Sequence, residues 1–294
     1  MTTGDSSAAV SGRTQFAVLS GLPFAKMTGS GNDFVFFDAR EVPIDAVTRP
    51  EVIRAICHRH NGIGADGLVV LEPRAGDADV RIHFYNADGT SADLCGNATL
   101  CSTALSAAVG MAPSTGMRLS TGSGLIHSKV QGLPSIALQP VLEVHPDMPV
   151  ALVPGERQVG FAIAGVPHLV ILCDNAESVD VAGRGSNLRW HESTGPAGAN
   201  VNWVSPLPDG RWRYRTFERG VEGETLACGT GAVATAILLT RWGHAASPSI
   251  AIQTSSGRDL LVTLDPVGPA GAAGFRPTLE GEGRVVFRGH IEAL

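Results

Sequence analysis

Short apolar runs recur along the chain, and most have the length of strands rather than of helices. The predicted strands lie at 34–38, 67–71, 80–85, 168–173, 201–204, 212–217, 259–264 and 284–291, between turns rich in Gly, Pro and Asp. One helix is predicted over residues 50–60, because Thr48 and Glu51 have the spacing of a capping box and Gly62 lies beyond the end. Two more helices are predicted after Cys95 and Cys228. The chain therefore combines many short strands with few helices.

Two segments of the chain repeat the same pattern. Residues 94–110 and 227–243 each contain Cys-Gly, a polar Asn or Thr, an Ala-rich apolar stretch and a closing Gly fifteen positions after the cysteine. The same offset of 133 residues aligns the turn STGSG at 120–124 with QTSSG at 253–257. This agreement indicates an internal duplication that produces two similar domains, each with a Cys-Gly at a strand-to-helix turn.

The domain limits follow from this repeat and from composition. The 294 residues are 44% hydrophobic and 17% charged, which is enough apolar material for a substantial core. We expect a polar, mobile leader at residues 1–21, an N-terminal domain at 22–140 and a C-terminal domain at 141–283, with prolines marking the linker near 138–147. The last strand, within 284–294, is a candidate to complete the N-terminal domain.

Charge and cysteine content exclude several classes of protein. With 22 basic and 28 acidic residues the net charge is −6, and no basic stretch suits nucleic acid. No apolar run approaches the about 18 residues that span a membrane, and the first residues lack the pattern of a secretory signal. The five cysteines, an odd number in a long chain, do not form a disulfide framework. We therefore expect a cytoplasmic protein that binds neither nucleic acid nor membrane.

The repeated cysteines suggest acid/base chemistry. A thiol at a helix N-terminus lies near backbone N–H groups that lower its pKa from ~8.5 and that can also bind a carboxylate. Two such turns facing each other would hold one carboxylate, so that one sulfur removes the α-proton and the other delivers a proton to the opposite face. Such a site inverts a stereocentre with neither a cofactor nor a metal. A single cysteine at an Ala-rich helix start is usually only a small buried residue, but the duplication favours catalysis for Cys95 and Cys228. Cys57, Cys101 and Cys173 are predicted to be structural.

Seven stretches carry a resemblance to a known family. They are KMTGSGNDF (26–34), GIGADGL (62–68), YNADGT (85–90), CGNATLC (95–101), GVPH (165–168), ANVN (199–202) and ERGVEGETLACGTGA (218–232). In this order they resemble the diaminopimelate epimerase family, whose members interconvert LL- and meso-diaminopimelate without pyridoxal phosphate. The resemblance covers nearly the whole chain after residue 22. It implies an α+β fold of two similar pseudo-symmetric domains, each a mixed β-sheet curled around a central helix, with the active site in the cleft between them, and a homodimer.

The resemblance also implies a set of site residues for an amino-acid substrate. Cys95 and Cys228 would be the acid/base pair, and His168 would lie beside their sulfurs. At the reacting carbon, Glu218 would bind the ammonium group. The carboxylate on the same carbon would be bound by the backbone at Gly96, Asn97, Gly229 and Thr230. Arg219 would pair with the distal carboxylate as a guanidinium fork, and Asn32, Asn86 and Asn200 would hydrogen-bond polar groups of the substrate. Simpler interpretations stay open: Asn86 as a turn former, Glu218 and Arg219 as a surface ion pair, and His168 as an ordinary buried histidine.

Three departures from the family pattern bear on the substrate. Val166 stands where the family usually has an asparagine that helps to recognise the distal end, residues 98–100 read Ala-Thr-Leu in place of Gly-Ala-Arg, and the loop at 222–224 is one residue longer. One alternative is therefore a racemase of the same fold for another amino acid such as histidine, although Arg219 argues for a second carboxylate. Another alternative is an amino-acid-binding module without catalysis.

Two other motifs resemble a dinucleotide-binding fingerprint and a metal site, but their context favours neither. Residues 62–67 match GxGxxG, but they follow a helix and precede a strand, whereas a dinucleotide-binding fingerprint needs the reverse order. Residues 57–60, Cys-His-Arg-His, contain metal-ligating side chains without a second cluster at zinc spacing.

Overall fold

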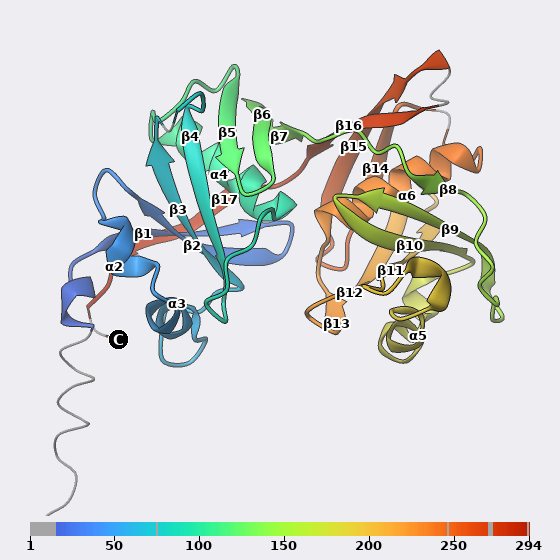
Figure 1. Ribbon diagram of the computed structural model, residues 1–294, viewed down its shortest axis with the longest axis horizontal. Coiled ribbons are helices and arrows are strands. Elements are labelled where there is room, and N and C mark those ends of the chain that lie inside the picture. Colours follow the sequence, from blue (N-terminus) through green and yellow to red (C-terminus); the bar gives the residue numbers. More distant parts are fainter. Residues whose placement is uncertain (1–15, 75, 246, 270–272, 293) are drawn as a thin grey trace, which may run out of the picture.

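The computed structural model describes residues 16–74, 76–245, 247–269, 273–292 and 294, and these form two halves of like design (Figure 1). The strands of the first half are β1 (Pro23–Gly29), β2 (Asn32–Asp38), β3 (Gly67–Pro73), β4 (Val80–Asn86), β5 (Met117–Thr121), β6 (Gly124–Gln131), β7 (Leu133–Ala137) and β17 (Arg284–His290). Those of the second half are β8 (Val144–His145), β9 (Glu156–Ala164), β10 (Val166–Cys173), β11 (Asn200–Pro206), β12 (Trp212–Glu218), β13 (Gly223–Thr225), β14 (Ser249–Gln253), β15 (Asp259–Val267) and β16 (Gly274–Glu280). The helices are α2 (Ile44–Val47), α3 (Pro50–Cys57), α4 (Gly96–Ala108), α5 (Val181–Leu188) and α6 (Gly229–Arg241), with short 3₁₀ turns η1 (Ala17–Leu19), η2 (Ala176–Ser178) and η3 (Glu192–Thr194).

The strands of each half follow the same order. In the first half neighbouring strands run β17, β1, β2, β3, β4, β5, β6, β7, and in the second β8, β9, β10, β11, β12, β14, β15, β16, with β13 also paired to β12. Parallel pairs stand at equivalent places, β2–β3 with β4–β5 and β10–β11 with β12–β14. An antiparallel pairing of β7 with β16 joins the halves. The predicted fold, two similar α+β domains with mixed sheets, is confirmed.

One helix lies in the centre of each half (Figure 1). Nearly every side chain in the first three turns of α4 and α6 is buried, and most of these residues are Ala, Gly, Ser or Thr. Small side chains let the sheet curl closely around a helix that is buried on all sides. Two residues after each helix stands a glycine with positive φ, Gly110 at +66° and Gly243 at +79°, a conformation that favours glycine just beyond a helix end. The repeated closing glycines of the sequence therefore have a structural reason.

The helix predicted over 50–60 is shorter, and its capping box is absent. Helix α3 begins at Pro50 after Arg49, with no side chain capping its first N–H groups. The Thr48 hydroxyl instead donates to the carbonyl of Ile44, at 3.0 Å. The prediction failed because Thr48 lies at the end of α2, whose free carbonyl competes for the same hydroxyl.

The two ends of the described chain meet in the first half. Strand β17 pairs antiparallel with β1, from Pro23 opposite His290 to Thr28 opposite Arg284. Residues 1–15 of the expected leader lie outside the described residues, but Leu19, also within that span, is fully buried in the same apolar cluster as Ile291. The folded chain thus includes residues before 22, while the limits at 140 and 141 stay a prediction. Within the described ranges, no helix combines the length and the hydropathy needed to cross a membrane.

Candidate active site

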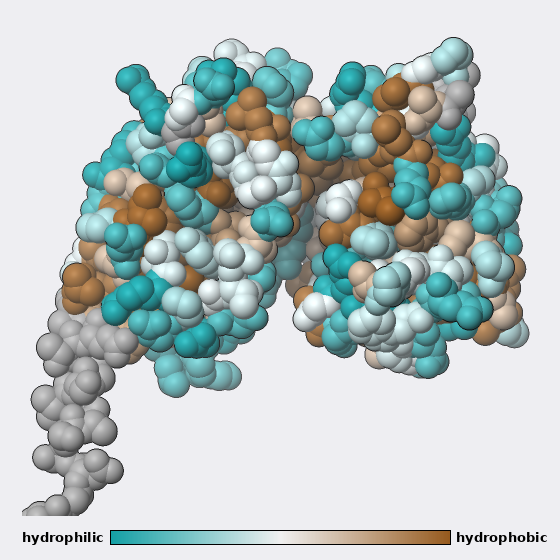
Figure 2. Space-filling view, viewed as in Figure 1, coloured by the Kyte–Doolittle hydropathy of each residue, from teal (hydrophilic) through white to brown (hydrophobic). Residues whose placement is uncertain are grey.

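The N-termini of α4 and α6 meet between the two halves, where the surface is indented (Figure 2). Gly96 and Gly229 are the first residues of these helices, and a Cβ on either glycine would lie 3.6 Å from the Cα of the other. Cys95 and Cys228 stand one residue earlier, each as the N-cap with extended backbone. The structure therefore brings the two repeated Cys-Gly turns to one place.

Burial changes the acidity of both thiols, although Cys228 is buried and Cys95 is only partly buried. Burial raises the pKa of Cys95 to about 11, although the backbone N–H groups of Ala98 and Asn97 favour its thiolate. Burial also raises the pKa of Cys228, and the Glu218 carboxylate raises the pKa of both thiols. The expectation of a lowered thiol pKa is wrong, because desolvation outweighs the effect of the helix N-terminus.

Asn97 connects the two halves beside the cysteines. Its Nδ2 donates to Asn32 Oδ1 at 2.6 Å and lies 3.5 Å from the carbonyl of Ala227, the residue before Cys228. Asn32 in turn donates to the Asp66 carboxylate at 3.1 Å. The Oδ1 of Asn97 is buried and has no hydrogen-bond partner among the described residues. Asn32 and Asn97 are thus joined directly at the start of α4.

His168 is linked to Cys228 through a threonine. Its Nε2 lies 3.1 Å from Thr230 Oγ1, which lies 3.5 Å from Cys228 Sγ. Burial and, to a smaller extent, the positive charge of Arg219 lower the pKa of His168 to about 3. A fully buried imidazole with this pKa is neutral at physiological pH.

Glu218 and Arg219 are adjacent in sequence but have different partners. The Thr225 hydroxyl donates to the Glu218 carboxylate, and burial raises the pKa of Glu218 although a hydrogen bond with Cys228 lowers it. The backbone N–H of Arg219 donates to Asn200 Oδ1 at 2.7 Å. In the described part of the chain the two side chains form no ion pair with each other, so the simple surface-pair interpretation does not describe them.

Asn86 makes the contacts of a turn residue. Its Nδ2 donates to Thr90 Oγ1 at 3.0 Å, and its backbone N–H donates to the Thr90 carbonyl at 2.9 Å. It lies opposite Gly67 at the end of β4. These hydrogen bonds belong to the turn before Cys95 and do not link Asn86 to the thiols.

The sequence interpretation missed a buried polar group behind Thr230. Asn202 Oδ1 accepts from the Tyr214 hydroxyl at 2.7 Å and from the Thr216 hydroxyl at 2.9 Å, while its Nδ2 donates to the Leu169 carbonyl at 2.7 Å. Asn202 is fully buried on β11, two residues after Asn200 and so on the same face. A second asparagine inside an otherwise apolar strand was the available signal, because a buried amide needs partners.

The two hairpins that approach the opposite half are packed unequally. At the β1–β2 turn, a Cβ on Gly31 would lie 2.7 Å from Ser256 Cβ and 2.9 Å from Leu226 Cβ. At the equivalent β9–β10 turn, a Cβ on Gly165 would meet only the Thr230 methyl, at 3.9 Å. A cavity lined by residues of both halves, among them Leu94, Gly165 and Thr230, lies at this turn. Free space beside the site is therefore on the side of Val166.

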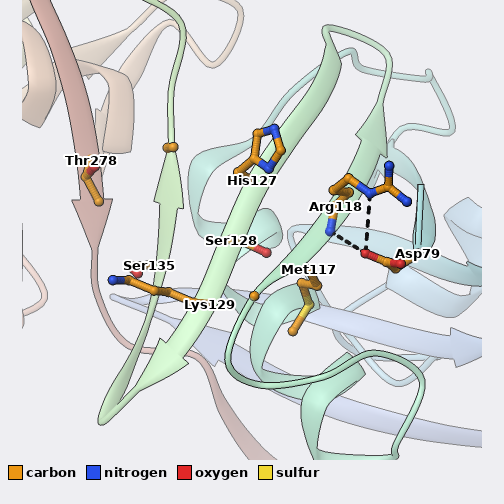
Figure 3. A pocket seen from close by; sticks show the side chains of 10 residues that line it. Asp79, Met117, Arg118, His127, Ser128, Lys129, Ser135 and Thr278 are labelled. Atoms are coloured by element: carbon orange, nitrogen blue, oxygen red, sulfur yellow. Dashed lines mark hydrogen bonds and ion pairs between the residues drawn. The ribbon is translucent and has the colours of Figure 1, made fainter. Parts of the chain in front are cut away.

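A larger hollow, of about 550 Å³, lies away from the cysteines on β5, β6, β7 and β16 (Figure 3). Arg118, His127 and Thr278 line it in one cross-strand row, and Asp79 pairs with Arg118 at 3.8 Å. None of the predicted site residues lines this hollow.

Solved structures share this architecture. A hydroxyproline epimerase from Agrobacterium vitis matches with a TM-score of 0.65 at 19% identity, covering 92% of each chain. A phenazine biosynthesis protein of the PhzF family from Bacillus anthracis matches with a TM-score of 0.72 at 12% identity, covering 92% of this chain and 98% of the other. At these identities the likeness concerns the fold. The chain thus has the two-domain fold that these epimerase and PhzF-family structures share.

Sequence relatives identify the family within this fold. The diaminopimelate epimerase family model matches residues 24–134 and 161–271. A diaminopimelate epimerase from Gemmatimonas aurantiaca is 68% identical over 277 residues, which cover 93% of this chain and all of the relative. The enzyme of that name from Aquifex aeolicus is 35% identical and covers 82% of this chain and 89% of its own. The chain belongs to the diaminopimelate epimerase family.

Proposed function

We propose that the protein interconverts LL- and meso-diaminopimelate, with Cys95 and Cys228 as the acid/base pair. The observation that carries this proposal is the meeting of the two helix N-termini, each with a cysteine as its N-cap. The 68% identical relative, matched along its whole length, bears the name of this activity.

In this reaction one cysteine takes a proton from the substrate and the other cysteine gives a proton to it. The carboxylate at the reacting carbon binds the N–H groups of Gly96, Asn97, Gly229 and Thr230. One cysteine, as thiolate, removes the α-proton, and the negative charge spreads into the carboxylate, where these N–H groups stabilise it. The other thiol then gives its proton to the opposite face of the carbon. One sulfur gains the proton that the substrate lost and the other loses one, so no cofactor takes part.

Glu218 controls the charge around both sulfurs. Its carboxylate raises the pKa of both thiols before substrate binds. The ammonium group of the substrate, held at Glu218, neutralises that negative charge beside the sulfurs. Thiolate formation is thereby favoured when substrate is present. His168 contributes a neutral, fully buried ring beside Cys228, through Thr230.

The distal end of the substrate needs different contacts. The guanidinium of Arg219 suits a carboxylate as a bidentate partner. Asn32, Asn86 and Asn200 supply amide groups for the remaining polar atoms, with Asn200 already joined to the backbone of Arg219. Val166 offers only an apolar surface next to the open side of the site.

Exchange of the α-proton in deuterium oxide tests the proposal. The reduced enzyme is incubated with LL-diaminopimelate, histidine, lysine or glutamate, and the α-proton signal is followed by NMR. Loss of the signal with diaminopimelate alone, with formation of the meso isomer, is expected. Exchange only with another amino acid would favour the histidine-type alternative, which the 68% identical relative and Arg219 oppose. Binding without any exchange would leave only the non-catalytic module.

Three expectations complete the proposal. The family resemblance implies a homodimer, which light scattering of the purified protein tests against a monomer mass near 30.5 kDa. A cytoplasmic location suits a mechanism that needs free thiols, and all five cysteines are free in the structure. We expect the domains at 22–140, completed by β17, and at 141–283.

A further inference from the structure

The orientation of the Asn202 amide is determined by its partners. The Leu169 carbonyl can only accept a hydrogen bond, so the group 2.7 Å from it is the amide nitrogen of Asn202. The hydroxyls of Tyr214 and Thr216 both lie at the opposite atom, the oxygen, at 2.7 and 2.9 Å. The second hydrogen on the nitrogen then faces His168 Nδ1, which is 3.3 Å away.

This orientation determines the tautomer of His168. A ring nitrogen that accepts a hydrogen bond carries no proton, so Nδ1 is bare. The neutral ring must therefore hold its proton on Nε2. That nitrogen lies 3.1 Å from Thr230 Oγ1 and donates to it.

The tautomer in turn directs the Thr230 hydroxyl. Its oxygen accepts from His168, so its own hydrogen is free to point at another acceptor. Cys228 Sγ is the neighbour, 3.5 Å from that oxygen. Every bond in this series, from Asn202 to the sulfur, runs in one direction. Asn202 and His168 are fully buried, so water does not compete for the bond between them, while Thr230 is partly exposed.

We propose that Asn202 is a positioning residue, which fixes His168 as the Nε2–H tautomer and thereby directs the Thr230 hydroxyl hydrogen at the Cys228 thiolate. The benefit to catalysis rests on the proposed function, whereas the tautomer and the acidity of Cys228 do not depend on any substrate. Asn202 itself touches neither the sulfur nor the reacting carbon in this arrangement.

The other groups around Cys228 explain why such a donor is needed. Glu218 on β12 and Cys95 before α4 both disfavour a negative charge on this sulfur, in addition to burial. The Tyr214 hydroxyl, also on β12, lies 3.5 Å from the Cys228 carbonyl but is bonded to Asn202. The groups that favour the thiolate are the Thr230 hydroxyl and the Gly231 N–H. Of these two, only the hydroxyl can turn away.

The first variant is Asn202→Asp, which keeps the shape but places an acceptor opposite Nδ1. The new oxygen replaces the nitrogen that lies 2.7 Å from the Leu169 carbonyl, which only accepts, so a proton on the carboxyl bonds there and the oxygen accepts from His168. We then expect His168 to carry its proton on Nδ1, so that Nε2 accepts from Thr230 and the hydroxyl turns away from the sulfur. Nitrogen-15 NMR of the labelled histidine ring reports this change directly, with the His168 signal assigned by its loss in His168→Gln. The expected result is Nε2–H in the parent protein and Nδ1–H in the variant. An Nδ1–H ring in the parent would overturn the proposal.

The second readout is the acidity of Cys228. The rate of alkylation by iodoacetamide is measured against pH in a Cys95→Ala background, with the Cys228 peptide quantified by mass spectrometry. Loss of one hydrogen bond to a thiolate raises the pKa by about one unit, so alkylation below the pKa slows about tenfold. Both Asn202→Asp and Thr230→Val are expected to show this shift, and Thr230→Ser, which keeps the hydroxyl, is expected to show little. An unchanged profile in Thr230→Val would overturn the proposal.

A double variant shows whether Asn202→Asp changes the pKa of Cys228 through the Thr230 hydroxyl or through the negative charge of the aspartate. If Asn202 acts through the Thr230 hydroxyl, Asn202→Asp adds no further shift in Thr230→Val; a full further shift would mean that the charge acts through space and would overturn the proposal. Thr235→Val is the matched control, since the Thr235 hydroxyl on the same helix is buried and unpartnered within the described structure. These measurements use no diaminopimelate. Failure of the proposed function would therefore appear as absent α-proton exchange with both readouts intact.

Discussion

Gly231→Ala tests how closely α6 approaches the polar group behind the site. Gly231 is the third residue of α6, and a Cβ there would overlap the Tyr214 hydroxyl and lie 2.6 Å from Asn202 Oδ1. Both side chains are fully buried and cannot move into solvent. The equivalent position of the first repeat, Ala98, is an alanine, and the strand residue there is Ile82 rather than a tyrosine. The closeness of Tyr214 therefore requires a glycine at 231.

The change in the free energy of unfolding follows from two costs and one gain. Overpacking a buried site costs ~1–3 kcal/mol, and breaking the Tyr214–Asn202 hydrogen bond costs ~1–3 kcal/mol. The better helix propensity of alanine returns ~1 kcal/mol. We expect a net loss of about 1–5 kcal/mol in the free energy of unfolding, measured by urea denaturation with tryptophan fluorescence. Gly116→Ala is the control, because a Cβ there meets nothing within 4 Å.

The double variant Gly231→Ala/Tyr214→Phe gives the sharper result. Removing the hydroxyl leaves the Tyr214 ring carbon 3.3 Å from the new methyl, a tight but tolerable contact, while Asn202 Oδ1 stays at 2.6 Å. The loss in the free energy of unfolding of the double variant should therefore be smaller, by ~1 kcal/mol or more, than the sum of the losses of the two single variants. Additive losses, or a Gly231→Ala protein as stable as the parent, would refute this account of the packing.

Three further predictions concern the thiols and the charges beside them. Cys95→Ala and Cys228→Ala should each abolish epimerisation with an unchanged circular dichroism spectrum; near-normal turnover in either would contradict the two-thiol mechanism. Mild oxidation should inactivate the parent protein and a thiol reductant should restore it, because sulfurs that share one α-carbon are close enough for a disulfide; activity indifferent to oxidant would mean that they do not approach. Burial raises the pKa of Asp33, but hydrogen bonds from Arg59 and Lys26 outweigh it and hold that pKa at about 2. Since this value is lowered on folding, its contribution to stability is present above pH ~4 and is lost as the pH falls toward 2; Asp33→Asn should therefore flatten the acid-unfolding curve in this window, and a curve as steep as that of the parent would argue against it.

The repeat is what the sequence determined best. The offset of 133 residues predicted that Cys95 and Cys228 occupy equivalent turns, and both are N-caps of central helices. Strands such as β10 and β17 were also visible from their apolar runs. These features are local or are copied by duplication, so they survive in a one-dimensional pattern. The predicted capping box at Thr48 was wrong for the same reason, because a local motif cannot show with which of two neighbouring helices the hydroxyl forms a hydrogen bond.

Only the tertiary structure decided how the repeats are used. The contact of Gly96 with Gly229 and the pairing of β7 with β16 join residues more than 100 positions apart. The direction of the Cys95 and Cys228 pKa shifts depends on burial, which a helix N-terminus alone does not reveal. The role of Asn202 follows from its contacts with Leu169, Tyr214 and His168, three residues on two other strands. Distances and desolvation of this kind arise when the sheets curl around their helices, and the sequence pattern records the helices and strands but not the space between them.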